Sequence, residues 1–322
     1  MQGAGQCNLS CNQLPMPVTD RVFGNAMAQT LPSGTKPRIR RQKIAEAMTT
    51  PQTILITGCS SGIGQALALE FKRLGHTVYA TARQPAALDA LTALGLRAVE
   101  LDVTSADSIE KARAQIAAQS ARLDMLINNA GYGQFGAMMD ADSDTLRRQF
   151  ETNVIAPVAI SRAFLPLLRA SNQACIANIG SISGLVTTPF AGVYCASKAA
   201  LHALSDAMRM ELGPLGVRVV TVQPGGIRSK FGDNAEHLIQ FPEGSLYTPI
   251  AKFVRGRAQL SQRGATPCEV FVATVAAHLL NPAAGPICRT GSQSTRLPLL
   301  KRLLPTRRLD AKMQKLFGLD RL

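Results

Sequence analysis

From residue 52 onward, short apolar runs rich in β-branched residues alternate with longer segments that have helical periodicity. Parallel strands need long crossover connections, and helices usually supply them. The alternation therefore indicates an α/β fold, with a doubly wound and mainly parallel sheet covered by helices on both faces. Seven strands are predicted, namely Thr53–Thr57, Thr77–Thr81, Arg97–Leu101, Met125–Asn128, Ala174–Gly180, Val217–Gln223 and a short one near Pro286–Arg289. The longest predicted helices are Asp144–Arg169 and Val193–Leu212.

The predicted domain boundaries lie where the alternation of strands and helices starts, is interrupted and ends. Residues 49–290 form one predicted domain, and residues 229–264 interrupt it with a mixture of Phe, Pro, Gly and charge that is typical of a substrate loop. Residues 1–48 lack periodicity and are predicted to be disordered. They are either a targeting segment or the product of a misassigned start, because Met48 directly precedes the first strand. Residues 291–322 form a basic, amphipathic C-terminal segment.

Composition excludes several classes of protein. With 46% hydrophobic and 17% charged residues the chain can bury a core, and no apolar run reaches the 18 residues of a membrane span. The seven cysteines are scattered without zinc-ligand spacing, which predicts a reduced setting and no metal site. No secretory signal pattern is visible at the start of the sequence, so we expect a cytoplasmic protein.

The net charge of +14 is concentrated at the two ends of the chain. The central part is nearly neutral, and it shows neither a basic docking face with interleaved aromatic residues nor a reading helix. A nucleic-acid partner is therefore not expected.

A glycine-rich motif, Thr57–Gly64, connects the first strand to the first helix. Glycines allow a sharp turn and close approach to a pyrophosphate, while the helix N-terminus offers free N–H groups. A plain turn is the alternative, but the position between strand and helix favours a dinucleotide site.

The second strand ends in Ala82 and Arg83, where an acidic residue would select NAD. An arginine can pair with a 2′-phosphate, so NADP(H) is the preferred cofactor and NAD(H) the alternative. Asp102, after the third strand, is either an acceptor for the adenine amino group or an N-cap of the next helix. Asn128–Gly131 closes the fourth strand with small and amide side chains, which suit close passage of a nucleoside or a turn.

Tyr194 and Lys198 lie one helical turn apart, on one face of a predicted helix. Ser181 ends the preceding strand, where its hydroxyl can sit beside the phenol. These three side chains are the candidate catalytic group.

The glycine motif, Asn128–Gly131, Asn153, Ser181, the Tyr194/Lys198 pair and Pro224-Gly225 occur in the order found in classical short-chain dehydrogenases/reductases, which this sequence resembles between residues 50 and 229. Residues 180–198 and 79–83 are similar to the branch that contains 17β-hydroxysteroid and retinol dehydrogenases. Two departures stand out. Ser229 replaces a common Thr, and Ser61 replaces a basic residue of some NADP enzymes.

The resemblance implies a Rossmann fold and an NADP(H)-dependent oxidoreductase that interconverts an alcohol, secondary or primary, and its carbonyl by hydride transfer. Tyr194 would be the general acid or base, Ser181 would polarise the substrate oxygen, and Lys198 would hold the nicotinamide ribose. Asn153 would bind a water in a proton relay, or be a helix-interior residue satisfied by backbone. The implied cofactor contacts are Gly58, Ser60, Ser61, Gly62, Ile63, Gly64, Arg83, Asp102, Val103, Asn129, Ala130, Gly131, Tyr194, Lys198, Pro224, Gly225, Ile227 and Ser229.

For the chemistry we expect the charge of Lys198 and an oxidised nicotinamide to favour the phenolate of Tyr194. The expected pocket segments, residues 185–193 and 231–253, are mostly apolar with few charges, which predicts a lipophilic substrate. A homodimer or homotetramer is expected. The competing functions are a catalytically silent NADP sensor and a membrane-surface scaffold on the same fold.

The C-terminal segment carries an apolar stripe of Leu309, Met313, Leu316 and Phe317 among basic residues. The stripe either packs over the substrate loop or a neighbouring subunit, or makes peripheral contact with an anionic membrane.

Overall fold

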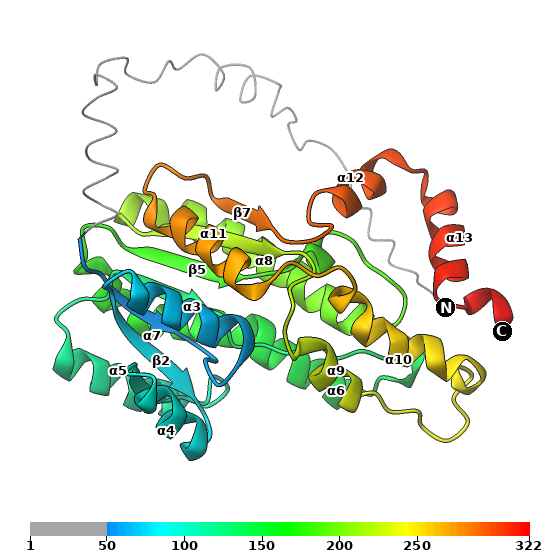
Figure 1. Cartoon of the computed structure of the whole chain (residues 1–322), viewed down its shortest axis with the longest axis horizontal. Coiled ribbons are helices and arrows are strands. Elements are labelled where there is room, and N and C mark those ends of the chain that lie inside the picture. Colours follow the sequence, from blue (N-terminus) through cyan, green and yellow to red (C-terminus); the bar gives the residue numbers. More distant parts are fainter. Residues whose placement is uncertain (1–49) are drawn as a thin grey trace, which may run out of the picture. The chain divides into compact units, whose positions relative to one another are not determined.

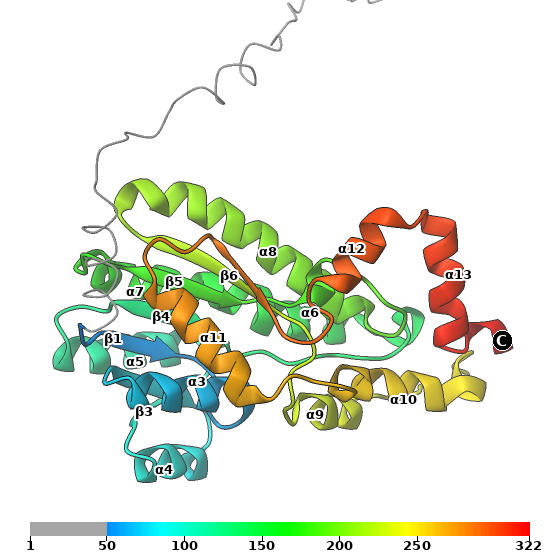
Figure 2. The same ribbon diagram turned by 45° about the horizontal axis from the view of Figure 1, so that its top comes forward.

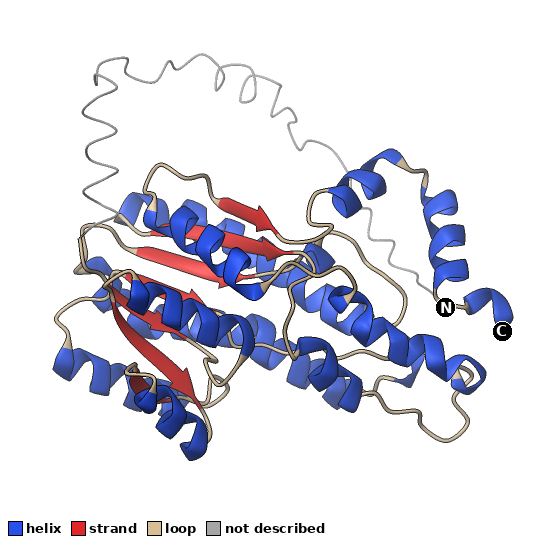
Figure 3. Ribbon diagram, in the orientation of Figure 1, coloured by secondary structure: helices blue, strands red, loops and turns tan. Residues whose placement is uncertain are grey.

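The structure is a computed structural model that describes residues 50–322, so the prediction for residues 1–48 lies outside the described part. Its centre is a sheet of seven parallel strands in the order β3-β2-β1-β4-β5-β6-β7 (Figures 1 and 3). The strands are β1 (Thr53–Ile56), β2 (Thr77–Ala82), β3 (Arg97–Glu100), β4 (Met125–Asn128), β5 (Cys175–Ile179), β6 (Arg218–Pro224) and β7 (Ile287–Thr290). The predicted fold class and strands are confirmed, and strand ends differ by about one residue.

The strand order reverses beside β1. The chain moves from β1 outward to β3, then crosses back to place β4 on the other side of β1. In open parallel sheets, ligands bind in the crevice at the carboxyl ends of the strands where the order reverses. The topology therefore places a candidate site beside the glycine motif that follows β1.

Helices cover both faces of the sheet, as predicted (Figure 2). One core cluster joins the sheet to α3, α4 and α11, with Phe71 and Phe271 fully buried in it. The other joins the opposite face to α5, α7 and α8, around Ile116 and Phe164. These helices are α3 (Gly62–Arg73), α4 (Pro85–Ala93), α5 (Ala106–Gln119), α7 (Ala156–Arg169), α8 (Gly192–Leu212) and α11 (Cys268–Leu280).

The helix predicted over residues 144–169 is divided into three parts. These are α6 (Ser143–Phe150), a π-helical turn (Glu151–Ile155) and α7. Pro157 has no N–H to donate to the carbonyl of Asn153 four residues earlier, so an α-helical bond cannot form there. The wider turn forms instead, as is frequent at functional sites.

The predicted substrate loop is largely helical. It contains α9 (Phe231–His237) and α10 (Ala251–Gln259), which pack with the segment before α8 in a third apolar cluster. The C-terminal helices α12 (Arg296–Leu303) and α13 (Thr306–Leu316) follow β7, and Phe317 is buried in this same cluster. Figures 1 and 2 show α13 beside the end of α10.

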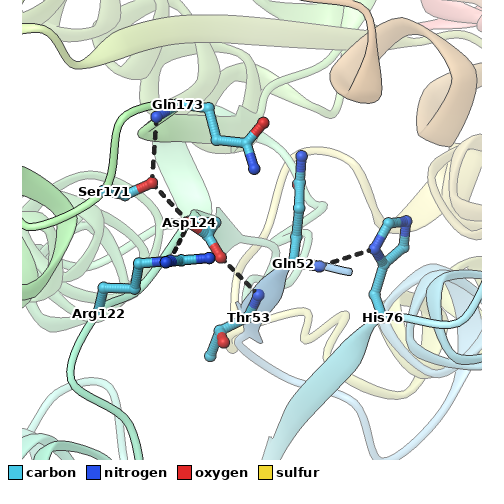
Figure 4. Close-up of polar contacts among 7 residues, drawn as sticks. All are labelled: Gln52, Thr53, His76, Arg122, Asp124, Ser171 and Gln173. Atoms are coloured by element: carbon cyan, nitrogen blue, oxygen red, sulfur yellow. Dashed lines mark hydrogen bonds and ion pairs between the residues drawn. The ribbon is translucent and has the colours of Figure 1, made fainter. Parts of the chain in front are cut away.

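At the amino ends of the strands, a polar network surrounds the buried carboxylate of Asp124 (Figure 4). Asp124 accepts hydrogen bonds from the backbone N–H of Thr53 at 2.8 Å and from Arg122 Nε at 3.0 Å, as well as from the Ser171 hydroxyl. These contacts join the start of β1 to the segments before β4 and β5. The Asp124 carboxylate is therefore engaged in structural hydrogen bonds. The candidate site lies at the other end of the sheet, at the carboxyl ends of the strands.

Among residues 50–322, no helix combines the length and the apolar character that crossing a membrane requires.

Candidate active site

A cavity of about 1120 Å³ lies at the carboxyl edge of the sheet and extends from the glycine motif to α13. Every cofactor contact predicted from the sequence lines this cavity, and so does Ser181. Asn153 does not line it and lies in the layer behind. The C-terminal segment contributes Leu297, Met313 and Leu316 to the wall. The residues predicted to contact the cofactor thus lie along one cavity, and their role in cofactor binding stays a prediction.

The glycine motif forms a tight cradle after β1. Gly58 has a φ of +70°, a conformation that favours glycine. A Cβ on Gly64 would lie 2.3 Å from the Gly58 carbonyl oxygen and 2.4 Å from Asn129 Nδ2, so no side chain fits there. The Asn129 amide donates to the carbonyls of Thr57 and Gly58 at 2.9 and 3.0 Å and fixes the loop.

The first turn of α3 points into this cradle. Its N-cap, Ser61, makes no side-chain cap hydrogen bond, which leaves first-turn N–H groups for a ligand. Backbone donors at a helix N-terminus beside a glycine turn fit a pyrophosphate. The residues present therefore fit a dinucleotide cofactor.

The far end of the cavity holds Arg83 and Asp102. Arg83 is exposed and lines the cavity directly after β2. Asp102 Oδ1 accepts hydrogen bonds from the N–H of Thr104 at 2.9 Å and from its hydroxyl at 2.8 Å. These bonds, with a smaller contribution from the Arg83 charge, lower the pKa of Asp102. The N-cap alternative for Asp102 is wrong, because Ser105 caps α5.

Tyr194, Ser181 and Lys198 meet at the centre of the cavity. Tyr194 and Lys198 come from adjacent turns of α8 and are buried, while Ser181 follows β5 and hydrogen-bonds the phenol. Lys198 Nζ donates to the carbonyl of Ile179 at 2.7 Å and lies 6.0 Å from the centre of the Tyr194 ring. The N–H of Ser183 donates to the Ser181 oxygen at 3.0 Å and holds this hydroxyl beside the phenol.

Burial governs the protonation of this group. It raises the pKa of Tyr194 to about 12, although the Ser181 hydrogen bond opposes the shift, and it lowers the pKa of Lys198 to about 8. Burial penalises the phenolate and acts against the effect expected of Lys198, and the expectation that Lys198 and an oxidised nicotinamide together favour the phenolate stays a prediction. At neutral pH the phenol is protonated and Lys198 is mostly an ammonium.

Asn153 connects the loop after β4 to α8. Its side-chain amide donates to the carbonyl of Tyr132 at 3.0 Å and to the hydroxyl of Ser197 at 3.1 Å, and its oxygen accepts from the N–H of Tyr132. Ser197 in turn donates to the carbonyl of Tyr194. The polar atoms of the Asn153 side chain therefore hydrogen-bond to groups of the protein, which agrees with the structural alternative for this residue. The water relay stays a prediction.

The sequence analysis did not predict Arg257 as a wall residue, nor Arg148, Lys230 and Arg263, which line the cavity at exposed positions. Arg257, on α10, is buried and lines the cavity, four residues beyond the segment that was judged apolar. Single-sequence patterning gave no signal for it, because Arg257 is flanked by the exposed Arg255 and by Arg263 in a segment that reads as a solvated basic stretch. In both segments expected to form the pocket, residues 185–193 and 231–253, the residues that line the cavity are uncharged, and Arg257 lies beyond them.

Comparisons with known proteins agree with this geometry. The family profile described as short chain dehydrogenase matches residues 52–238. A short-chain dehydrogenase of Talaromyces islandicus is 34% identical over 84% of this chain and 97% of its own length. An NADPH-dependent 1-acyldihydroxyacetone phosphate reductase of Schizosaccharomyces pombe is 38% identical over 64% of this chain and 71% of its own length.

The fold has close counterparts among solved structures. The crystal structure of a short-chain dehydrogenase from Streptomyces avermitilis superposes with a TM-score of 0.70, at 30% identity, and covers 84% of this chain and 98% of that one. The likeness extends over the sheet, the cradle and the segment that carries Tyr194. This chain belongs to the short-chain dehydrogenase/reductase family and is an oxidoreductase.

Proposed function

We propose that this protein is an NADP(H)-dependent reductase of lipophilic carbonyl compounds that also runs in the alcohol-oxidising direction, with Tyr194 as general acid and base. The observation that carries the proposal is the meeting of Tyr194, Ser181 and Lys198 in one cavity that begins at the glycine cradle. The names of two relatives specify reductases, one of 3-ketodihydrosphingosine and one of 1-acyldihydroxyacetone phosphate. The names support reduction as the direction in the cell.

The proton chemistry follows from the burial of Tyr194. With its pKa raised to about 12, the phenol holds a proton at neutral pH and can donate it to a developing alkoxide. Ser181 donates a second hydrogen bond to the same oxygen and stabilises its growing charge. When bound, the reduced nicotinamide supplies the hydride that reduces the carbonyl carbon. Oxidation uses the same contacts in reverse.

Lys198 and Asn153 position the groups around the Tyr194 phenol. One N–H of Lys198 is held by the carbonyl of Ile179, which aims the remaining N–H groups at the cavity, where the ribose hydroxyls of the cofactor would bind. The ammonium beside the Tyr194 ring also stabilises the phenolate left after proton donation. Asn153 fixes the loop at Tyr132 and, through Ser197, the backbone of α8 at Tyr194. We propose that the protons which return to Tyr194 pass along Lys198 and Asn153.

The preference for NADP(H) rests on the end of β2. Ala82 offers no carboxylate to the adenosine ribose, and Arg83 directly after it lines the cavity and is free of ion pairs among the described residues. Guanidinium groups bind phosphates through paired hydrogen bonds. The proposed cofactor-binding set is the full group of cavity residues predicted from the sequence.

Substitution of Tyr194 by Phe tests the proposal. The variant should lose turnover of carbonyl substrates with NADPH, while its NADPH affinity, measured by fluorescence titration, stays close to that of the wild type. Tyr247→Phe is the matched control, because this phenol packs on Phe190 in the same apolar cluster without lining the cavity. An active Tyr194→Phe enzyme would contradict the mechanism. A wild type that binds NADPH but reduces no carbonyl in a broad panel would favour the NADP-sensing alternative.

We also propose that the protein is cytoplasmic and forms a homo-oligomer. The described cysteines are all free, which suits a reducing cytoplasm. Ile155, Val158, Leu204 and Met210 expose apolar surface around α7 and α8, which suits a homodimer or homotetramer. Light scattering of the purified protein measures the assembly, and a strictly monomeric mass would refute it.

The membrane-contact alternative for the C-terminal segment depends on which apolar side chains remain outside. Phe317 is buried and Met313 is half-buried in the third cluster, whereas Leu316 is exposed, so part of the stripe packs over the substrate region. Leu299 and Leu303 of α12 stay exposed beside Lys301 and Arg302. Reversible binding to anionic vesicles at low salt would support peripheral contact through α12, and its absence would leave packing as the role of the segment.

A further inference from the structure

Arg257 is a buried cation that the chemistry above does not use. Its side chain is 7% exposed and belongs to the wall of the catalytic cavity. Its Nε donates to the hydroxyl of Thr188 at 2.7 Å, and its guanidinium carbon lies 4.8 Å from the centre of the Phe135 ring. The guanidinium is thus held in place on one side by a hydroxyl and on another by an aromatic face.

The charge of Arg257 has no counter-ion among the described residues. The ion pairs of residues 50–322 do not include it. The titratable groups that act on it are Tyr194 and Cys195, and burial raises the pKa of both, so each is neutral at pH 7. A second cation, Lys301, also acts on Cys195. An arginine cannot escape this cost by losing its proton, and a buried charge without a partner is expensive.

The position of the guanidinium relates it to the substrate. Phe135 packs against both Arg257 and Tyr194, with its ring centre 5.7 Å from that of the phenol. The charge of Arg257 acts on Tyr194, and both residues line one cavity, on elements other than the glycine cradle and β2. The apolar side chains of this cavity include Val186, Leu238, Leu260, Leu297, Met313 and Leu316.

We propose that Arg257 is a specificity-determining residue that binds an anionic group of the substrate, a carboxylate or a phosphate, close to the carbonyl that is reduced. The substrate is then an amphiphile, with its charged group on Arg257, its carbonyl between Tyr194 and Ser181, and an apolar remainder towards α13. This inference rests on the proposed reductase function and narrows its substrate class.

Matched substrates test the inference. We would measure kcat/KM for NADPH-dependent reduction of 4-oxodecanoate and of its methyl ester, which differ in charge but not in carbonyl position. The wild type should prefer the acid by about 10- to 150-fold, the range that corresponds to about 1.5–3 kcal/mol for a hydrogen bond to a charged group. Arg257→Met should lose this preference, because kcat/KM for the acid falls about 10- to 150-fold more than kcat/KM for the ester.

Arg255→Met is the control for charge removal. Arg255 lies on the same helix, is exposed, and its guanidinium carbon is 5.5 Å from the Phe241 ring centre, but it does not line the cavity. This variant should keep the preference for the acid. Arg257→Lys retains the charge without the fork, and we expect it to keep part of the preference.

A binding experiment separates this inference from the reductase proposal. With NADP⁺ present, decanoate and decyl phosphate should raise the melting temperature of the wild type, decanamide should not, and Arg257→Met should lose the response to both anions. The stronger of the two anions identifies the class of charged group. If no carbonyl is reduced but this response is found, the reductase proposal fails and the anion site stands.

A purely structural role for Arg257 predicts different results. Arg257→Met would then lower the melting temperature and reduce kcat/KM for acid and ester alike, and the wild type would not distinguish the two. A parallel loss of kcat/KM for acid and ester in Arg257→Met would overturn the inference. So would a wild type that does not distinguish acid from ester, or one that responds equally to decanoate and decanamide.

Discussion

Substitution of Gly64 by Ala tests the cradle at its tightest point. The added Cβ would lie 2.3 Å from the Gly58 carbonyl oxygen and 2.4 Å from Asn129 Nδ2, distances that real Cβ atoms do not tolerate. Both partners are held in place, because the Asn129 amide donates to the carbonyls of Thr57 and Gly58. The loop must therefore move away from α3, and these two hydrogen bonds break or lengthen.

The expected cost follows from these contacts. Two hydrogen bonds contribute about 1 kcal/mol each, and the forced shift of a packed backbone costs about 1–3 kcal/mol. We expect the free energy of unfolding to fall by about 2–5 kcal/mol and Tm to fall by about 5–15 °C. NADPH affinity should weaken by about tenfold or more, because the displaced N–H groups are those proposed to bind the pyrophosphate.

The assay is urea unfolding together with fluorescence titration of NADPH, and Gly256→Ala is the control. Gly256 lies within α10 without a positive φ, and no atom of another segment lies within 4 Å of a Cβ added there. That variant should keep its NADPH affinity and be neutral or more stable by about 0.4–1 kcal/mol. A Gly64→Ala protein with wild-type stability and affinity would refute the close approach and, with it, the cradle.

Three further predictions concern the cofactor, the buried lysine and the C-terminal wall. Arg83→Ala should raise KM for NADPH by about 10- to 150-fold and leave KM for NADH nearly unchanged, and equal effects on both would show that Arg83 does not bind the phosphate. Lys198→Met should lose activity and NADPH affinity. Burial lowers the pKa of Lys198 from 10.5 to about 8, so between these pH values the unfolded chain binds more protons than the folded protein. The free energy of unfolding of the wild type, relative to Lys198→Met, should therefore rise between pH 8 and 10.5. A constant difference between the two proteins in urea unfolding would contradict this prediction. Phe317→Ala should raise KM for lipophilic carbonyls and lower Tm, since Phe317 is buried against Phe190, whereas Leu303→Ala at an exposed position should change neither.

The fold and the placement of the glycine cradle, Tyr194 and Lys198 along one cavity could be predicted from the sequence because their signals are local. Strand, turn and helix follow one another within Thr53–Arg73, and a glycine that must adopt positive φ, such as Gly58, stands in the sequence as a glycine. Tyr194 and Lys198 share a helix face through their spacing alone. Each of these inferences needs only neighbouring residues and a known period.

The direction of the Tyr194 shift could not be predicted in the same way. Opposite charge and burial act on the phenol in opposite senses, and their balance depends on how many side chains from distant segments surround it. Phe135 and Phe231 both pack on the Tyr194 ring, from the loop after β4 and from α9. The sequence shows the lysine one turn away but does not show the two aromatic rings that exclude water.

The substrate half of the cavity depends still more on distant contacts. Phe190 has a φ of +61°, which is unfavourable for a bulky residue, and its ring packs on Tyr247 and Phe317. Such a conformation persists only where the surrounding structure requires it, and here the surroundings are the substrate segment and the last residues of the chain. The same cluster holds Phe135 beneath Arg257, so the C-terminal segment, the strained turn and the buried cation are parts of one wall. Changes in Phe317 should therefore alter the preference for anionic over neutral substrates without altering NADPH affinity, because the cradle after β1 contributes no residue to this cluster.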